Sequence, residues 1–223
     1  MATGIFVTAT DTGAGKTHFC SLLVRRLREA GVDAVGMKPF CCGDRGDAER
    51  LHEACDGTVE MGLINPVWLQ VPAAPYAAAM IENRALDVAL ALAAFQTLRS
   101  RHRVVVVEGV GGWRVPLTEN LCLSGFAAQL ELPVLVVTAN RLGALNHTQL
   151  TVDSIVARGS RCIGVVLNEP APQEPDPAQI TNPAILEHLL DVPLLGEIAY
   201  GADTLPANVL ENLLKQQPLI TNT

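Results

Sequence analysis

Long hydrophobic runs are missing from this sequence, and so is an excess of positive charge. No apolar stretch approaches the roughly 18 residues that a membrane-spanning helix needs. The 223 residues carry a net charge of −7, whereas proteins that bind nucleic acids or anionic membranes nonspecifically normally carry the opposite balance. We therefore expect neither a membrane nor a nucleic acid among the partners. A small anionic ligand is compatible with this composition, because the geometry of a single loop can bind it.

Cysteine is present, but not in a pattern that binds metal. None of the six cysteines forms a C-x-x-C pair, and no Cys/His cluster has the spacing of a zinc site. We expect no signal peptide before the first expected strand. Charged residues make up only 17% of the chain, but apolar residues make up 49%, which is typical of a globular protein. We therefore expect a reduced, cytoplasmic globular protein.

Short apolar runs alternate with segments of helical periodicity along the chain. The expected strands are residues 5–7, 34–38, 104–108, 133–138, 162–168 and 194–198. The expected helices are one that follows Lys16 and ends at Gly31, and residues 47–55, 85–101, 146–157, 184–190 and 206–215. Residues 40–47 are expected to form a loop, the region from residue 63 to be irregular, and the proline-rich residues 170–183 to form a mobile loop. The pattern predicts an α/β fold: a single domain over residues 1–223, with a doubly wound, mostly parallel sheet and helices on both faces.

Residues 8–17, which read TATDTGAGKT, join the first expected strand to the first expected helix. The backbone N–H groups of such a turn can cradle phosphate oxygens, and the helix N-terminus adds positive potential. Gly15, Lys16 and Thr17 fit the pattern G-x-x-x-x-G-K-[ST], whereas Thr10 occupies the first glycine position. A turn that caps an ordinary helix is the alternative. The position directly after a strand favours polyphosphate binding, with Lys16 reaching the outer phosphates.

Three oxygen-bearing side chains suit Mg²⁺, which prefers hard oxygen ligands in octahedral geometry. They are the Thr17 hydroxyl and the carboxylates of Asp47 and Glu108. Glu108 ends a run of four valines, where a carboxylate is costly without a cation. Asp47 is explained equally well as a helix N-cap.

Two further residues end expected strands, at the edge of a parallel sheet where ligands bind. Lys38 would add a second positive charge beside Lys16, which phosphoryl transfer needs; a solvated lysine is the alternative. Asn168 could read the edge of a base or merely cap a turn. The N–H groups near residues 143–146 could bind a carboxylate, although an ordinary capped helix start is the simpler interpretation.

Six motifs follow one another over almost the whole chain. They are residues 6–17 (FVTATDTGAGKT), 38–39 (KP), 65–66 (NP), 108–113 (EGVGGW), 142–147 (LGALNH) and 193–198 (PLLGEI). In this order they resemble the dethiobiotin synthetase family, of the MinD/ParA-like branch of P-loop proteins. The combination of T-D-T before G-K-T with E-G-x-G-G-W is the most specific part of the resemblance. The fold that it implies is P-loop NTPase-like.

The resemblance implies an ATP- and Mg²⁺-dependent ring closure in biotin synthesis, catalysed by a cyclo-ligase. The substrates would be 7,8-diaminononanoate, CO₂ or bicarbonate, and ATP. One amine takes up CO₂ as a carbamate, which attacks the γ-phosphate to give a carbamic-phosphoric anhydride. The second amine then closes the ureido ring, which gives dethiobiotin, ADP and phosphate. The resemblance also implies a homodimer in which the carboxylate tail of the substrate contacts the second subunit.

The resemblance assigns roles to individual residues. The catalytic residues would be Lys16, Lys38 and Thr12. The nucleotide-binding residues would be Thr12, Gly13, Ala14, Gly15, Lys16, Thr17, Asn168 and Glu197, with residues near 197–201 closing the adenine pocket. The substrate-binding residues would be Lys38, Cys42, Gly111 and Gly112, together with Ala144, Leu145 and Asn146 of the second subunit. The metal ligands would be Thr17, Asp47 and Glu108.

Three positions depart from the family pattern. Ala9 stands where glycine is common, Cys42 stands where Ser or Thr often helps to hold the carbamate, and Ala199 stands where proline often follows G-E-I. The loop between Lys38 and Asp47 is also short. The alternative function is that of a MinD/ParA-like regulatory ATPase that switches partner binding. Such proteins usually carry an additional lysine early in the phosphate loop, and this loop has none before Lys16.

Overall fold

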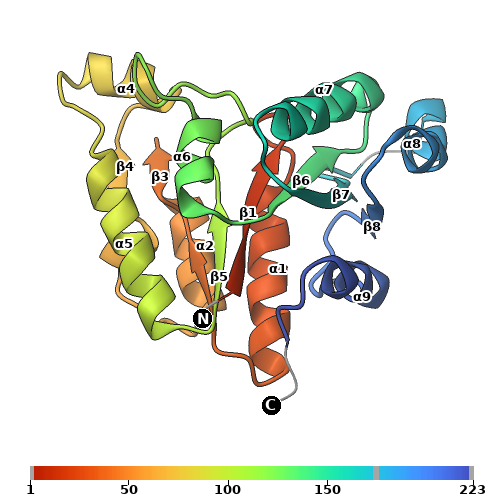
Figure 1. The fold of residues 1–223 in the computed structure, drawn as a ribbon, viewed down its shortest axis with the longest axis horizontal. Coiled ribbons are helices and arrows are strands. Elements are labelled where there is room, and N and C mark those ends of the chain that lie inside the picture. The colour runs from red at the N-terminus through yellow and green to blue at the C-terminus, as the bar shows by residue number, and fades with distance from the viewer. Residues whose placement is uncertain (1–2, 173–175, 221–223) are drawn as a thin grey trace.

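The computed structural model describes residues 3–172 and 176–220. A central six-stranded sheet has the strand order β2-β5-β1-β6-β7-β8, and all its pairings are parallel (Figure 1). Its strands are β1 (Thr3–Ala9), β2 (Ala34–Met37), β5 (Val104–Glu108), β6 (Val134–Ala139), β7 (Cys162–Asn168) and β8 (Leu194–Ile198). All six expected strands are therefore confirmed, with small shifts in their bounds.

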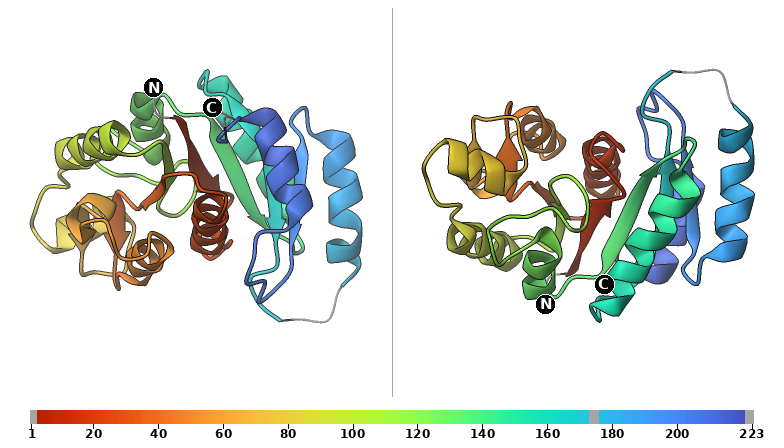
Figure 2. Two further views of the ribbon diagram at one scale, coloured as in Figure 1. Left: turned by 90° about the horizontal axis from the view of Figure 1, so that it is seen from below. Right: turned by 90° about the horizontal axis from the view of Figure 1, so that it is seen from above.

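Helices cover both faces of the sheet, as predicted for a doubly wound fold. They are α1 (Lys16–Glu29), α2 (Gly46–Ala54), α3 (Met61–Ile64), α4 (Pro75–Ile81), α5 (Val88–Arg101), α6 (Leu123–Leu130), α7 (Ala144–Ala157), α8 (Pro177–Leu189) and α9 (Ala207–Gln216). Figure 2 shows α1 and α2 on one face of the sheet and α5 and α6 on the other. Within the described ranges, no helix is both long and apolar enough to cross a bilayer.

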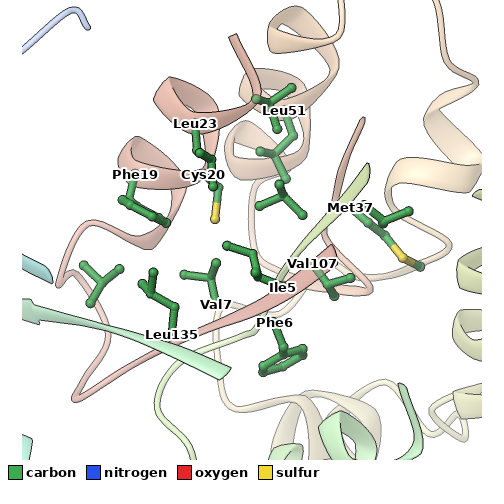
Figure 3. Packing of buried hydrophobic residues seen from close by; sticks show 14 of the residues in the cluster. Ile5, Phe6, Val7, Phe19, Cys20, Leu23, Met37, Leu51, Val107 and Leu135 are labelled. Atoms are coloured by element: carbon green, nitrogen blue, oxygen red, sulfur yellow. The ribbon is translucent and has the colours of Figure 1, made fainter. Parts of the chain in front are cut away.

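The core forms where strands are buried on both sides. In β1, Ile5 and Val7 point toward α1, where they meet Phe19 and Leu23, whereas Phe6 points to the opposite face (Figure 3). The four valines of β5 are buried without alternation, as expected for a parallel strand covered on both faces. Sheet and helices thereby fix the carboxyl ends of β1, β2, β5 and β7 at one edge.

The region between β2 and α5 has more structure than the sequence predicts. Residues 40–47 are not entirely a loop, because β3 (Phe40–Cys42) pairs in parallel with β4 (Val67–Leu69) in a separate two-stranded sheet. The region from residue 63, predicted to be irregular, contains β4 and α4. Strands of three residues are too short to show a periodicity, and their pairing joins residues about 27 positions apart in the chain.

Besides α3 and α4, which were not predicted, two helices outside that region depart from the prediction. The helix α6 was not predicted, although its apolar residues pack on the core. The helix α8 begins at Pro177 rather than at residue 184, with a capping box between Asp176 and Gln179. Pro183 lies inside α8 and donates no hydrogen bond to the Gln179 carbonyl, which accepts one from Asn140 Nδ2 at 3.2 Å instead. Part of the predicted mobile loop, including Pro175, lies outside the described residues.

Candidate functional site

The phosphate-loop motif joins β1 to α1 as predicted. Gly15 occupies the N-cap position of α1 with a φ of 98°, and no side chain caps the helix there. The N–H groups at the start of a helix have no partner within the helix, so those of α1 can bind an anion. Asn168, at the end of β7, donates from Nδ2 to the Ala14 carbonyl at 3.0 Å, and its Oδ1 is buried without a partner in the described structure.

The three predicted metal ligands lie together beside this loop. The Thr17 hydroxyl lies 2.7 Å from Asp47 Oδ1 and 2.8 Å from Glu108 Oε1. The Lys38 ammonium joins the same group, with Asp47 Oδ2 at 2.6 Å, Glu108 Oε1 in direct contact and the Gly109 carbonyl at 3.3 Å. Four side chains from α1, β5, α2 and the end of β2 therefore meet at one point of the sheet edge.

Asp47 reaches this cluster from the first turn of α2 and is not an N-cap, because the N-cap of α2 is Arg45. Its contacts therefore exclude the N-cap interpretation and place Asp47 in the cluster. The short loop after Lys38 is long enough to bring the carboxylate to Thr17. Lys38 is likewise not a solvated strand-end lysine, because only 2% of its surface is exposed.

Burial and ion pairing act against each other within the cluster. Burial lowers the pKa of Lys38, but Glu108 and Asp47 raise it by more, so that it lies well above the ordinary value of a lysine. Burial raises the pKa of Glu108, and the contacts with Lys38 and Thr17 oppose this. Burial also raises the pKa of Asp47, but Lys38 and Thr17 together hold it below the usual range. Lys38 therefore stays an ammonium between two acidic groups.

Lys16 is buried, and no carboxylate among the described residues pairs with it. Its Nζ donates to the Asp11 carbonyl at 3.4 Å, which is a weak hydrogen bond. Burial, and secondly the charge of Lys38, lower the pKa of Lys16 to about 8. A buried ammonium with so few groups to offset its loss of hydration is well suited to bind an anion.

The chemistry of the cluster fits Mg²⁺. A hydroxyl and two carboxylates are the hard oxygen donors that this ion binds, and Glu108 Oε2 is fully buried without a hydrogen-bond partner in the described structure. A buried carboxylate oxygen of this kind needs a cation or a donor. Thr17, Asp47 and Glu108 would hold the ion, and phosphate oxygens and water would complete its coordination.

The cluster forms part of the wall of a cavity of about 860 Å³. Of the predicted site residues, the following line it: Thr12, Gly13, Gly15, Lys16, Thr17, Lys38, Cys42, Asp47, Glu108, Gly111 and Asn168. Gly111 contributes backbone at a position where a Cβ atom would come within 2.7 Å of Val115 Cγ2. The cavity is large enough for a nucleotide and a second small substrate.

Other predicted residues do not line this cavity. Ala14 is a buried residue of the phosphate loop itself, and a Cβ atom on Gly112 would lie 3.4 Å from the Ala9 carbonyl oxygen and 3.5 Å from that of Thr10. Glu197 is exposed on β8; Tyr200 and Gly201 line the cavity a few residues further along. Ala144, Leu145 and Asn146 form the first turn of α7, where the N-cap Gly143 makes no side-chain cap.

Sequence reasoning missed a second group of cavity residues. They are His18, Cys41, Asp44, Arg50, Pro72, Ala73, Ala74, Pro75, Val110, Val115, Glu169 and Pro170. Half of them lie on or beside the small β3–β4 sheet and α4, which the sequence did not predict: Cys41, Asp44, Pro72, Ala73, Ala74 and Pro75. Adjacency in the chain to a predicted site residue was the available signal for His18, Cys41, Val110 and Glu169.

Comparisons with known proteins show what the whole chain is similar to. Residues 3–208 match the AAA domain family. An ATP-dependent dethiobiotin synthetase BioD of Akkermansia muciniphila is 45% identical over 204 residues, which cover 92% of this chain and 95% of that protein. One of Anaeromyxobacter dehalogenans is 46% identical over 190 residues, covering 83% and 85%.

Among solved structures, the chain is similar to the septum site-determining protein MinD of Pyrococcus horikoshii, complexed with Mg-ADP. The TM-score is 0.56 at 17% identity, and the match covers 98% of this chain and 90% of that one. A likeness at this identity shows a shared fold alone.

Proposed function

Because the chain belongs to the ATP-dependent dethiobiotin synthetase family, we propose that it closes the ureido ring of dethiobiotin from 7,8-diaminononanoate, CO₂ and ATP. In this proposal the enzyme is a cyclo-ligase that forms carbon–nitrogen bonds. We also propose that residues 1–223 act as a single domain and that the protein works in the cytoplasm.

The observation that supports the proposal best is the cluster of Thr17, Asp47, Glu108 and Lys38 beside the phosphate loop. Phosphoryl transfer needs positioning and charge neutralisation, with little covalent chemistry from the protein. A buried lysine pair and an oxygen-rich cluster meet this need. The reaction requires no covalent nucleophile, and burial raises the pKa of Cys41 to about 12 and that of Cys42 to about 11, which keeps both thiols protonated.

In this proposal, different residues of the cavity have different roles. Gly13 and Gly15 would present backbone N–H groups to the phosphates, and Thr12 would contact the carbamate or phosphate. Lys16, still charged at pH 7, would neutralise the transferred phosphoryl group. Mg²⁺, held by the cluster, would neutralise charge on the phosphate oxygens. The carboxylates of Asp47 and Glu108 hold the Lys38 ammonium in place. From that position it would also stabilise the carbamate.

The first amine adds to CO₂, which forms one C–N bond, and loses a proton to give the carbamate. A carbamate oxygen forms a bond to the γ-phosphorus as the bond to ADP breaks. The second amine then attacks the carbamoyl carbon, which forms the C–N bond of the ring and expels phosphate. The proton of that amine leaves with the phosphate or to water.

Part of the cavity lining suits an aliphatic diamine. Val110, Val115, Ala74 and Pro75 contribute apolar surface, along which a chain of methylene groups would lie. Asn168 would bind adenine through its free Oδ1, with Tyr200 and Gly201 closing the pocket in place of Glu197.

We further propose a homodimer, in which the first turn of α7 (Ala144, Leu145 and Asn146) binds the carboxylate tail of the substrate held by the partner. The N–H groups of Leu145 and Asn146 would bind the tail, because the Ala144 N–H already donates to the Arg141 carbonyl at 3.0 Å.

The proposal is tested by following ADP and dethiobiotin with MgATP and bicarbonate, in the presence and absence of 7,8-diaminononanoate. We expect one ADP for each dethiobiotin and little ADP without the diamine. Lys38→Ala should slow the formation of both products by about 10²-fold or more, whereas Lys215→Ala, at an exposed position on α9, should leave their rates unchanged. ADP release that does not depend on the diamine would contradict the proposal and favour a regulatory ATPase.

A further inference from the structure

A buried polar residue, Asn65, contacts the backbone of Lys38. Only 2% of its surface is exposed, and its side-chain amide uses all its hydrogen-bonding groups. Nδ2 donates to the Lys38 carbonyl at 2.9 Å and to the Val67 carbonyl at 3.1 Å. The Lys38 N–H in turn donates to the Ile64 carbonyl at 2.7 Å, so the backbone of Lys38 is held on both sides.

Arg45 reaches Asn65 from the other direction. Its Nε donates to Asn65 Oδ1 at 2.9 Å, and one terminal nitrogen donates to the Asn65 carbonyl at 3.1 Å. The guanidinium also lies over the ring of Trp68, 5.1 Å from its centroid. Trp68 Nε1 donates to the Gly43 carbonyl at 2.7 Å, which ties down the start of the same loop.

This arrangement matters because of where Arg45 stands in the chain. It is the N-cap of α2, two residues before Asp47, and no strand of the main sheet holds this part of the chain. Arg45 and Asn65 therefore connect the first turn of α2 to the backbone of Lys38. Asp47 and Lys38 meet at 2.6 Å at the other end of this connection.

We propose that Arg45 and Asn65 are positioning residues that hold the first turn of α2 against Lys38, so that Asp47 faces Thr17 and Glu108. The inference rests on the proposed function only in that these groups hold the metal of a bound nucleotide. Neither residue lines the cavity, so both act through Asp47 and Lys38. The planar guanidinium of Arg45 binds Asn65 at two points, and a lysine ammonium cannot reproduce this geometry.

The test is Arg45→Lys, which keeps the charge and removes the fork. We expect this variant to bind ADP with Mg²⁺ about tenfold or more weakly, as is common for partners that orient metal ligands. Binding of ADP in EDTA should stay within about twofold of the wild type, because the phosphate loop itself is untouched. Calorimetry measures both affinities, and the magnesium concentration for half-maximal activity should rise in parallel.

The matched control is Arg28→Lys. Arg28 makes a similar fork, with Nε and Nη2 to Asp56 Oδ2 at 3.0 and 2.8 Å and Nη1 to the Ala34 carbonyl at 3.1 Å, but it lies outside the cavity wall. It should lose comparable stability in urea and keep wild-type MgADP binding. A second variant, Trp68→Phe, removes the hydrogen bond to Gly43 and leaves a smaller ring beneath the Arg45 guanidinium, so it should weaken MgADP binding in the same direction.

Equal loss of binding with and without Mg²⁺, or no loss beyond that of the control, would overturn the inference. It would also be overturned by wild-type binding that does not depend on Mg²⁺. No diamine is present in this measurement. A wild type that makes no dethiobiotin would therefore refute the proposed function and leave this result standing.

Discussion

Gly15 and Asn168 are packed so closely that a Cβ atom on Gly15 would lie 2.1 Å from Asn168 Nδ2. The residue also has a φ of 98°, which L-residues with a side chain rarely adopt. The phosphate loop is thus shaped both by its own backbone and by a side chain from the end of β7.

The first prediction concerns Gly15→Ala. The added methyl must displace Asn168 or the loop, and a positive φ alone costs about 1–2 kcal/mol, so nucleotide affinity should fall by about tenfold or more. Calorimetry with MgADP measures the loss. Gly159→Ala is the control: its φ is 72° and a Cβ there meets no atom within 4 Å. If the two variants bound MgADP equally well, the packing of Asn168 on the loop would have no role in binding.

The second prediction separates the two lysines of the site. Lys16→Ala and Lys38→Ala should each lower kcat by about 10²-fold or more, because both remove positive charge from the transition state. Their effects on stability should differ. Removal of Lys38 leaves Glu108 buried and unpaired beside Asp47, which should lower the free energy of unfolding by about 3–5 kcal/mol. Lys16 has no such partner, so its removal should leave that energy unchanged or raise it.

Urea unfolding of the two variants without nucleotide measures this difference. Near-normal kcat in Lys38→Ala would remove its assigned catalytic role. Equal destabilisation by both substitutions would mean that the ion pair of Lys38 contributes nothing specific to the fold.

The third prediction concerns metal removal. A ligand that binds only the folded state stabilises it by about 2.7 kcal/mol at a hundred times its Kd. ADP with Mg²⁺ should therefore raise the Tm of the wild type more than the same ADP with EDTA. In Glu108→Gln the two shifts should be equal, because one carboxylate of the cluster is gone. A persistent magnesium-dependent shift in Glu108→Gln would place the ion elsewhere.

The fourth prediction concerns cysteine reactivity. Burial raises the pKa of Cys122, but the Ser124 hydroxyl, the Gly125 N–H and the guanidinium groups of Arg158 and Arg114 outweigh it, so the net pKa lies below that of an ordinary thiol. The thiolate is the reactive form, so alkylation of Cys122 should already be substantial at a pH where ordinary thiols are mostly protonated.

Mass spectrometry after brief treatment with iodoacetamide at pH 7.5 checks this order. Cys41 and Cys42 should react later, because burial holds their pKa values at about 12 and 11. Labelling of Cys42 before Cys122 would show that access from the cavity matters more than thiolate character.

Local signals in the sequence predicted much of the fold. The four valines of β5 predicted a strand covered on both faces. The spacing of Gly15, Lys16 and Thr17 predicted where α1 begins. What the sequence could not predict depends on contacts between distant segments. The pairing of β3 with β4 and the position of α8 around Pro183 are examples, because in α8 the lost hydrogen bond is replaced by Asn140.

The same holds for the site. Glu108 could be identified because burying a carboxylate at the end of an apolar strand costs free energy unless a cation compensates it. Asp47 was also predicted as a ligand, but the local sequence explains it equally well as a helix N-cap until the 2.7 Å contact with Thr17 is seen. No local pattern shows that Asn168 would bond to Ala14, 154 residues away, or that Glu197 would face solvent while Tyr200 lines the cavity.

In the proposed reaction, a carbamate formed on the substrate attacks the γ-phosphate within this cavity. This step is tested most directly with ¹⁸O-labelled bicarbonate, the diamine and MgATP, in an incubation short enough to limit exchange with water. The bridging oxygen of the anhydride comes from CO₂ and leaves with phosphorus, so mass spectrometry should find one ¹⁸O in the released phosphate for each dethiobiotin formed. Dethiobiotin accompanied by unlabelled phosphate, or ATP hydrolysis without dethiobiotin, would contradict the account.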